Sequence, residues 1–308
     1  MPIFYVFLLL LTSFLWGGNF VFGKFLVGHA SPMTITTLRW LIAILVLFPI
    51  VLNKEKQLIP PKASILPLLF MGVTGVVFFN LFQFFALEKT SATNVGLIST
   101  LNPISIAIFS AFLLKEKLKT MQIFSMGISF LGVLMVLSKG ELSHIFSLRF
   151  NIGDLWMVAA VIIWGLYSIC SKWAMKKMSP MLATFYSGLF GVVILVPFNL
   201  SSFQIYNFNS SFLWAILYTG VISTVVCMVL WNIGVQKIGA TSSGIFLNFN
   251  PIFTSILAFF FLGERMTWFE LAGSIIVITG CFLFSWFGSS LNRKSKRKST
   301  KVHLKFGS

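Results

Sequence analysis

The sequence predicts an all-α integral membrane protein with ten transmembrane helices arranged as an inverted five-plus-five repeat. Of its 308 residues, 57% are hydrophobic and only 10% are charged, with a mean hydropathy of +0.93. One soluble core cannot bury that much apolar surface. The apolar residues fall into ten runs of about 20, the length that crosses a bilayer core of about 30 Å. The second half of the chain also repeats the first at a fixed offset of 148 residues.

The ten runs are joined by short links, so we expect no soluble domain. The first run is interpreted as a span and not as a signal peptide, because it lacks a basic leading segment and a small-residue cleavage site. We expect a first repeat over residues 3–138, a second over 153–287, and a basic tail over 288–308. The predicted spans are residues 3–26, 33–52, 64–86, 92–114, 119–138, 153–173, 181–200, 211–235, 241–262 and 267–287.

The repeat holds without a gap over many positions. Each half would contain five spans, an odd number, so the second half must enter the membrane from the opposite side. This predicts a pseudo-two-fold axis in the membrane plane. The matching segments include Trp16-Gly17 with Trp164-Gly165, Ser31-Pro32-Met33 with Ser179-Pro180-Met181, Asn102-Pro103-Ile104 with Asn250-Pro251-Ile252, and Glu116 with Glu264.

The most informative repeated segment is an Asn-Pro pair inside an apolar run, LNPISIAIFSAFLLKE in the first half and FNPIFTSILAFFFLGE in the second. Pro103 lies about 16 Å into its span, near the bilayer midplane, and Pro251 lies at the matching depth. Each proline leaves a carbonyl without its helical donor, at Ser99 and Leu247. A packing kink is one interpretation. A hinge at a polar substrate cavity between the halves is the other.

The 23 Lys and Arg residues sort by loop and predict the orientation. With a cytoplasmic N-terminus, ten lie in inner links, seven in the tail and six on the outer side. The positive-inside rule then places both termini in the cytoplasm of a multi-pass cytoplasmic-membrane protein. The tail is expected to lie against anionic lipid. Nucleic-acid binding is disfavoured because no aromatic-bearing basic fold accompanies the tail.

These features together resemble the drug/metabolite transporter superfamily, specifically its EamA family. The resemblance rests on the Trp-Gly pair with a lysine eight residues after the Trp, the Ser-Pro that opens the next run, the stretch TLRWLIA, and the endings NP…LLKE and NP…FLGE. It covers residues 5–287. It implies a ten-helix transporter of small metabolites, with amino acids, amines and drugs among the family's substrates and export the usual direction. It names no substrate for this chain.

Candidate substrate-binding residues are polar or aromatic side chains near the middle of the spans. Trp16 and Asn19 share one helix face, as do Trp164 and Tyr167 in the second half. Packing or an interfacial belt is the alternative for the tryptophans. The other candidates are amides near the middle of a span and the Ser99 position, and the alternative for buried amides is an interhelical hydrogen bond. These further candidates are Asn80, Gln83, Ser99, Asn102, Asn232, Asn248 and Asn250.

Arg39 is the single charge well inside a span. It either snorkels to the outer interface, pairs with an acid such as Glu88, or holds a substrate carboxylate. Its counterpart in the second half is Ser187, and that of Asn19 is Tyr167, so the two sides of a cavity differ chemically. Glu264, beside Arg265 at the end of the ninth span, favours a local ion pair over proton carriage.

The sequence contains no pattern of a catalytic site, a cofactor or a metal centre. It has no phosphate-binding loop, zinc-binding helix or thiol pair, and its three histidines fall in loops or the tail. Cys170, Cys227 and Cys281 lie in apolar runs and favour no disulfide. We therefore expect a transporter of a small solute. A membrane enzyme or a channel is the alternative, and the oligomeric state stays open.

Overall fold

The computed structural model describes residues 3–115, 120–138, 151–269, 271–280, 282–284 and 286–287. The described residues form helices and contain no β-strand beyond isolated bridges at Ala30. Eight helical stretches are long and apolar enough to cross a membrane. They are Ile3–Leu26, Pro32–Lys54, Lys62–Lys89, Ala92–Leu113, Ile152–Ala174, Pro180–Asn199, Ser210–Ile238 and Ala240–Leu262. The fold is therefore all-helical, with every one of these stretches ending within three residues of a predicted span.

Several spans are composites of shorter helical pieces. The first half contains α1 (Ile3–Leu26), α2 (Pro32–Lys54), α3 (Lys62–Met71), η1 (Gly72–Phe78), α4 (Phe79–Lys89), α5 (Ala92–Ile98), η2 (Ser99–Leu101), α6 (Asn102–Leu113) and α7 (Thr120–Ser138). The second half contains α9 (Ile152–Ala174), α10 (Pro180–Asn199), α11 (Ser210–Leu217), η3 (Tyr218–Val226), α12 (Cys227–Ile238), α13 (Ala240–Gly244), η4 (Ile245–Phe249) and α14 (Asn250–Leu262).

In two predicted spans the apolar helical stretch found within the described residues is shorter than a membrane crossing. These are the apolar parts of the fifth and tenth runs, Thr120–Gly132 and Leu271–Phe284. The ten-helix count therefore stays a prediction. Glu116, residues 139–150 and the basic tail lie outside the described residues.

Local sequence explains where two of the helices begin. Ser31 accepts a hydrogen bond from the backbone N of Thr34 at 3.2 Å, and Ser179 accepts one from the backbone N of Leu182 at 3.1 Å. Each serine is followed by a proline, whose fixed φ and missing N–H suit the first helical position. The repeated Ser-Pro pair therefore starts α2 and α10.

Four spans are interrupted near their middle, and each interruption has a matching one in the other half. The π-helical segments η1 and η3 interrupt the third and eighth runs, and the 3₁₀ turns η2 and η4 interrupt the fourth and ninth. Both turns end just before an Asn-Pro pair, at which α6 and α14 begin. Proline is compatible with a helix start and incompatible with a continuous helix. The two long runs are therefore divided where the sequence places Pro103 and Pro251.

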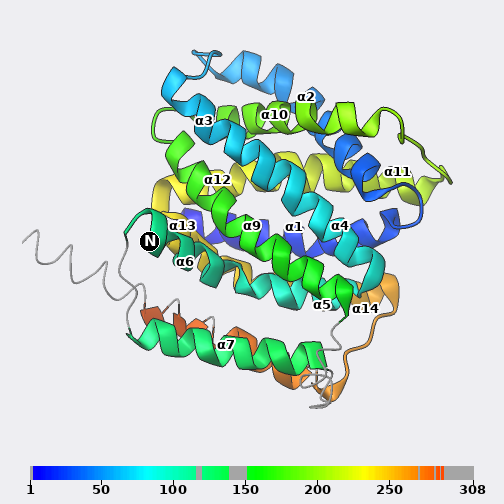
Figure 1. Ribbon diagram of the computed structural model, residues 1–308, viewed down its shortest axis with the longest axis vertical. Helices are drawn as coiled ribbons and strands as arrows, with labels where there is room; N and C mark the ends of the chain where they lie inside the picture. The colour runs from blue at the N-terminus through cyan, green and yellow to red at the C-terminus, as the bar shows by residue number, and fades with distance from the viewer. Residues whose placement is uncertain are drawn as a thin grey trace, which may run out of the picture.

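The two halves of the chain pack against each other throughout the bundle. The most extensive helix contacts join α4 to α9, α1 to α14, α6 to α9 and α2 to α10, each pair crossing between the halves. In Figure 1, α2 and α10 lie along one edge of the bundle and α7 lies along the opposite edge. Helices α1, α9 and α12 run between them. The centre of the molecule is therefore built by both halves.

Candidate functional site

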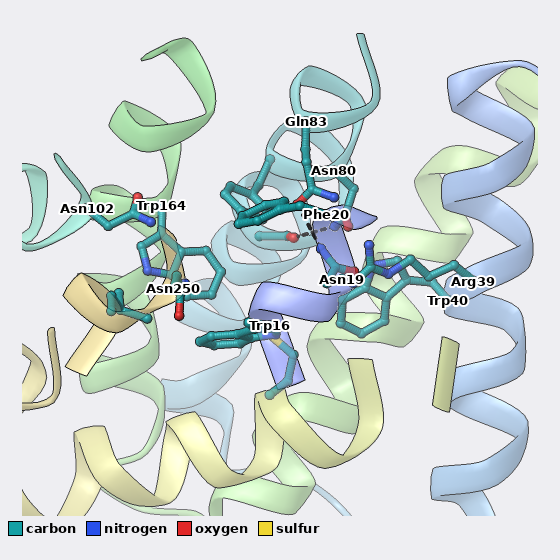
Figure 2. Close-up of a pocket in the computed structure, with 14 residues that line it drawn as sticks. Trp16, Asn19, Phe20, Arg39, Trp40, Asn80, Gln83, Asn102, Trp164 and Asn250 are labelled. Atoms are coloured by element: carbon teal, nitrogen blue, oxygen red, sulfur yellow. Dashed lines mark hydrogen bonds between the residues drawn. The ribbon is translucent and has the colours of Figure 1, made fainter. Parts of the chain in front are cut away.

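A small cavity with aromatic and polar walls lies where the helices of the two halves meet (Figure 2). The space that the centre of a water molecule can occupy in this cavity is about 30 Å³. This volume holds about two waters and is too small for an organic solute. The fourteen lining residues are Trp16, Asn19, Phe20, Arg39, Trp40, Gly75, Phe79, Asn80, Gln83, Asn102, Trp164, Met228, Leu247 and Asn250.

Eight of the twelve residues predicted to bind substrate line this cavity. They are Trp16, Asn19, Arg39, Asn80, Gln83, Asn102, Trp164 and Asn250. The eight come from six helices spread over both halves, so the fold gathers residues that lie more than 230 positions apart in the sequence. In Figure 2, Asn102, Asn250 and Trp164 lie on one side of the cluster, and Arg39 lies on the other.

The other four predicted residues are buried but do not line the cavity. The Ser99 hydroxyl donates a hydrogen bond to the carbonyl oxygen of Gly96 at 2.6 Å, within the same span. Asn248 lies in η4, and its amide has no hydrogen-bond partner among the described residues. Tyr167 and Asn232 bond to each other, as described below. The expectation that these side chains face the solute finds no support in this geometry.

The polar side of the cavity is a chain of hydrogen bonds that begins at Arg39. Its Nη2 donates to Ser223 Oγ at 3.0 Å, and Ser223 Oγ donates to Asn19 Oδ1 at 2.7 Å. Asn19 Nδ2 then donates to Gln83 Oε1 at 3.3 Å. Arg39 Nε donates separately to Thr224 Oγ1 at 2.7 Å. The chain joins α1, α2 and α4 of the first half to η3 of the second.

Arg39 has none of the structural roles expected for it. It is only 5% exposed, so its head does not snorkel to an interface. Both its hydrogen-bond partners are neutral hydroxyls, and it forms no ion pair with Glu88 or any other described residue. Its Nη1 has no hydrogen-bond partner among the described residues. The interpretations as a snorkelling residue or a partner of Glu88 are therefore wrong, because η3 supplies buried hydroxyls within reach.

The amides around the cavity differ in how firmly they are held. Asn80 Nδ2 donates to the carbonyl oxygens of Gly75 at 2.8 Å and Val76 at 2.9 Å. These bonds lie within its own span and hold the amide against the π-helical segment η1. The side-chain amides of Asn102 and Asn250 make no hydrogen bond to any described residue, and the Oδ1 atom of each is fully buried. The two Asn-Pro amides therefore each keep a buried acceptor without a hydrogen-bond partner among the described residues.

Aromatic rings form the other wall of the cavity. Trp16 and Trp164, which occupy equivalent positions in the repeat, meet edge to face with ring centroids 5.4 Å apart. Phe79 lies 4.8 Å from Trp164 between ring centroids. Trp16 Nε1 donates to the carbonyl oxygen of Ser223 at 3.1 Å, whereas Trp164 Nε1 has no partner among the described residues. Both tryptophans are buried at the centre, so they are not interfacial-belt residues.

A second buried polar cluster lies in the second half, behind the cavity wall, where the Tyr167 ring packs on Trp164. Tyr167 Oη donates to Asn232 Oδ1 at 3.3 Å, and Ser171 Oγ donates to the same oxygen at 2.9 Å. Asn232 Nδ2 donates to Thr184 Oγ1 at 2.9 Å. Every polar atom of the Asn232 side chain therefore has a protein partner. This cluster fastens α9, α10 and α12 together.

Sequence reasoning did not identify six of the lining residues. Most of them are apolar, and an apolar side chain that lines a cavity follows the same pattern as one that faces lipid. Gly75, which also lines the wall, packs so closely on the ring of Tyr167 that a Cβ would overlap it. The six residues are Phe20, Trp40, Gly75, Phe79, Met228 and Leu247.

Two charged side chains join four helices at one end of the bundle. Glu264, just beyond α14, accepts hydrogen bonds from the backbone N of Ala92 and of Thr93, both at 2.9 Å, and from Thr93 Oγ1 at 2.7 Å. Lys24 Nζ donates to the carbonyl oxygens of Leu87 at 2.5 Å and Thr90 at 2.9 Å. The carboxylate caps the start of α5 and the ammonium caps the end of α4. We call this arrangement the Glu264–Lys24 clamp.

The described residues contain no group of three or more His, Cys, Asp or Glu side chains placed to hold a metal ion. Cys170 and Cys227 are buried and free, and Cys281 lies outside the described residues. The fold and the cavity thus define a multi-pass membrane protein with a polar space between its two halves.

Comparison with known proteins identifies the family. The model of the EamA-like transporter family matches residues 3–138 and again residues 151–286. An uncharacterized transporter of Archaeoglobus fulgidus is 30% identical over 278 residues, covering 90% of this chain and 95% of its own. The uncharacterized transporter YyaM of Bacillus subtilis is 29% identical over 280 residues, covering 89% and 90%. The chain therefore belongs to the EamA-like transporter family.

A solved structure has the same fold. This crystal structure of another protein superposes on the present chain with a TM-score of 0.68 at 19% sequence identity. The match covers 92% of this chain and 97% of the other. The family and the names of the relatives point to a transporter rather than an enzyme, with a small-molecule substrate and a membrane environment.

Proposed function

We propose that this protein exports small organic metabolites, amino acids and related solutes among them, by alternating access through the central cavity. The observation that carries the proposal is the cavity itself, which combines aromatic walls with polar groups that have no described protein partner. Ligand sites typically combine apolar walls with a few well-placed polar groups. At about 30 Å³ the cavity is too small for such solutes, so binding requires the halves to separate.

An inverted repeat is the scaffold that we propose for this movement. The interruptions recur at the sequence offset of 148, since η1 begins at Gly72 and Gly220 lies within η3. Contacts recur in the same way. Gly17 packs against Phe253 and Gly165 against Ser105, and these pairs are related by the same offset with the halves exchanged. Such reciprocal contacts are what a pseudo-two-fold axis would produce.

Contacts between equivalent residues support the same axis. Two residues related by a two-fold axis can touch only if they lie close to it. Trp16 and Trp164 are equivalent and meet at the cavity. Ser129 and Val277 are equivalent, and Ser129 Oγ donates to the carbonyl oxygen of Val277 at 3.4 Å. The proposed axis would therefore pass through the substrate site.

We propose that the paired prolines supply the bending. Pro103 and Pro251 are buried beside the two free cavity amides, at the junction of a 3₁₀ turn and a helix. Missing hydrogen bonds at those junctions make them the natural points for α6 and α14 to change angle. Bending one junction would open the cavity towards one side, and bending the other would open it towards the opposite side.

The proposed orientation places both termini in the cytoplasm and the clamp at the outer end, in the cytoplasmic membrane. Its test is a cysteine at Ser143, in the predicted outer loop that lies outside the described residues, on a background lacking Cys170, Cys227 and Cys281. We expect an impermeant maleimide to label it in intact cells. Labelling only after lysis would reverse the orientation.

Reconstitution in liposomes tests the function. We expect saturable counterflow of at least one solute from a panel of radiolabelled amino acids, amines and aromatic metabolites, with the solute chemically unchanged. A conductance without saturation would indicate a channel, and a covalently altered solute would indicate an enzyme. Either result, or no flux with the whole panel, would overturn the proposal.

A further inference from the structure

The charge of the cavity restricts the solute. Arg39 is the only ionisable residue among the fourteen that line it, and no carboxylate of the described residues pairs with it. A guanidinium buried at membrane depth without a counter-ion is costly. We infer that the transported solute is a small aromatic monocarboxylate with no compensating cationic group, held by Arg39. The inference rests on the proposed function and narrows its substrate class to the related organic acids, which carry no amino group.

The direction of the hydrogen bonds supports an anion. Arg39 can only donate, so Ser223 Oγ must accept from it and donate its own proton to Asn19. Asn19 then presents Oδ1 to Ser223 and Nδ2 to Gln83, and Gln83 accepts through Oε1. The amide orientations are thus set by the arginine. The Nε2 group of Gln83 is left as a donor without a partner among the described residues.

The hydrogen-bond chain that begins at Arg39 therefore contains two donors without a described partner, Arg39 Nη1 and Gln83 Nε2. A carboxylate has two oxygens and about four acceptor positions, which is enough in number for both donors. An ammonium beside these two donors would find no acceptor there, because the unpartnered acceptors of the lining, Asn102 Oδ1 and Asn250 Oδ1, lie on the other side of the cavity. The polar side of the cavity is therefore built for a negative group.

The total charge of the loaded site separates the possible solutes. With a monoanion, the site formed by Arg39 and the solute is neutral. With a zwitterion it keeps one positive charge, and with an amine it holds two. A neutral complex is the least costly to enclose away from water. The free amides of Asn102 and Asn250 can bond to neutral polar substituents of the solute, and Trp16 and Trp164 can pack on its ring.

This inference also supplies a driving force for export. Moving one negative charge outward is favoured by an inside-negative membrane potential, which sustains roughly a 50-fold concentration ratio for each 100 mV. No acidic residue lies in the middle of any predicted span, so no proton relay through the midplane is available. An anion that leaves by uniport requires none.

A matched set of ligands tests the inference on the full-length protein in liposomes. The set is 3-phenylpropionate, phenylalanine, phenethylamine and 3-phenylpropanamide, which share a ring and differ in charge. We expect 3-phenylpropionate to bind at least tenfold more tightly than phenylalanine, measured by tryptophan fluorescence and counterflow. We also expect an inside-positive potassium diffusion potential to accelerate its uptake. Phenylalanine that binds as well or better, or a voltage-insensitive uptake, would overturn the inference while the proposed transport function stands.

Variants at Arg39 separate binding from structure. Arg39→Gln should weaken 3-phenylpropionate binding at least tenfold and change 3-phenylpropanamide binding less than twofold, whereas Arg39→Lys should retain part of the preference for the anion. Arg265→Gln, at an exposed arginine, is the matched control and should change neither. Equal loss of both ligands in Arg39→Gln, or retention of both, contradicts the assignment.

Discussion

The two halves of this protein supply very unequal shares of one cavity. Ten of its fourteen lining residues come from the first half and four from the second. Asn19 faces the cavity, whereas its equivalent Tyr167 forms a hydrogen bond with Asn232. Arg39 also faces the cavity, whereas its equivalent Ser187 donates to the carbonyl oxygen of Thr184 at 3.0 Å. The two halves repeat in sequence and yet line the cavity unequally. Under the proposed function the first half would supply most of the contacts to the solute, whereas Tyr167 and Ser187 of the second half form hydrogen bonds within that half.

Exchanging the residue types of the equivalent pair Asn19 and Tyr167 should have the largest effect on counterflow. Asn19→Tyr brings the residue of the second half into the first, where its ring would fill the cavity and remove the bonds to Ser223 and Gln83. We expect counterflow to fall at least 100-fold. The reciprocal change Tyr167→Asn should keep counterflow within tenfold of the wild type. Equal losses in both variants would show that the halves contribute alike.

Removing either of the two unpartnered amides, at Asn102 or Asn250, should have the second-largest effect. Asn102→Ala and Asn250→Ala each remove one hydrogen bond to solute, which corresponds to roughly a fivefold loss of affinity. Thermal stability should be unchanged, because neither amide bonds to a described residue. Equilibrium binding and a melting curve in detergent measure the two quantities. Unchanged affinity in both variants would return these amides to a packing role.

The paired prolines should change rate more than affinity. Pro103→Ala and Pro251→Ala each restore a helical hydrogen bond, so each should straighten one junction and slow net flux about threefold, with binding nearly unaffected. The access bias should be opposite in the two variants, measured by the labelling of engineered cysteines from each side. If both variants shift the access bias in the same direction, or if neither variant shifts it, the prolines serve only helix packing.

The smallest effect is expected at the second polar cluster. Tyr167→Phe removes the hydrogen bond to Asn232 and should lower the free energy of unfolding by about 1 kcal/mol, with solute affinity changed less than twofold. Tyr206→Phe, at an exposed tyrosine, serves as the control. A loss of affinity without a loss of stability would place Tyr167 at the solute.

Span boundaries were predictable because apolar length and helix-starting residues are local properties. Ser31-Pro32 and Ser179-Pro180 mark helix starts directly, and both start helices in the structure. The π-helical segments were not predicted, since η1 and η3 depend on how the spans pack. The sequence shows the glycines at 72 and 220 without showing that another helix approaches each of them.

The site was predictable only where a residue type is unusual for a membrane span. Asn19 and Arg39 stand out among apolar neighbours, whereas Phe79 and Met228 do not. Arg39 shows the remaining difficulty. Its partners Ser223 and Thr224 lie more than 180 positions away, and small hydroxyl residues are common in any transmembrane helix. Partner choice is a tertiary property, and the repeat offset alone does not give it.

The Glu264–Lys24 clamp has a kinetic consequence. If the proposed alternating access parts α14 from α5 at that end of the bundle, it would separate one carboxylate from three donors, and hydrogen bonds to charged groups are each worth about 1.5–3 kcal/mol. A bound solute can offset this cost with its own contacts, whereas an empty carrier has nothing to offset it. We therefore expect the return of the empty carrier to be the slow step of the cycle, so that exchange of one solute molecule for another runs faster than net release.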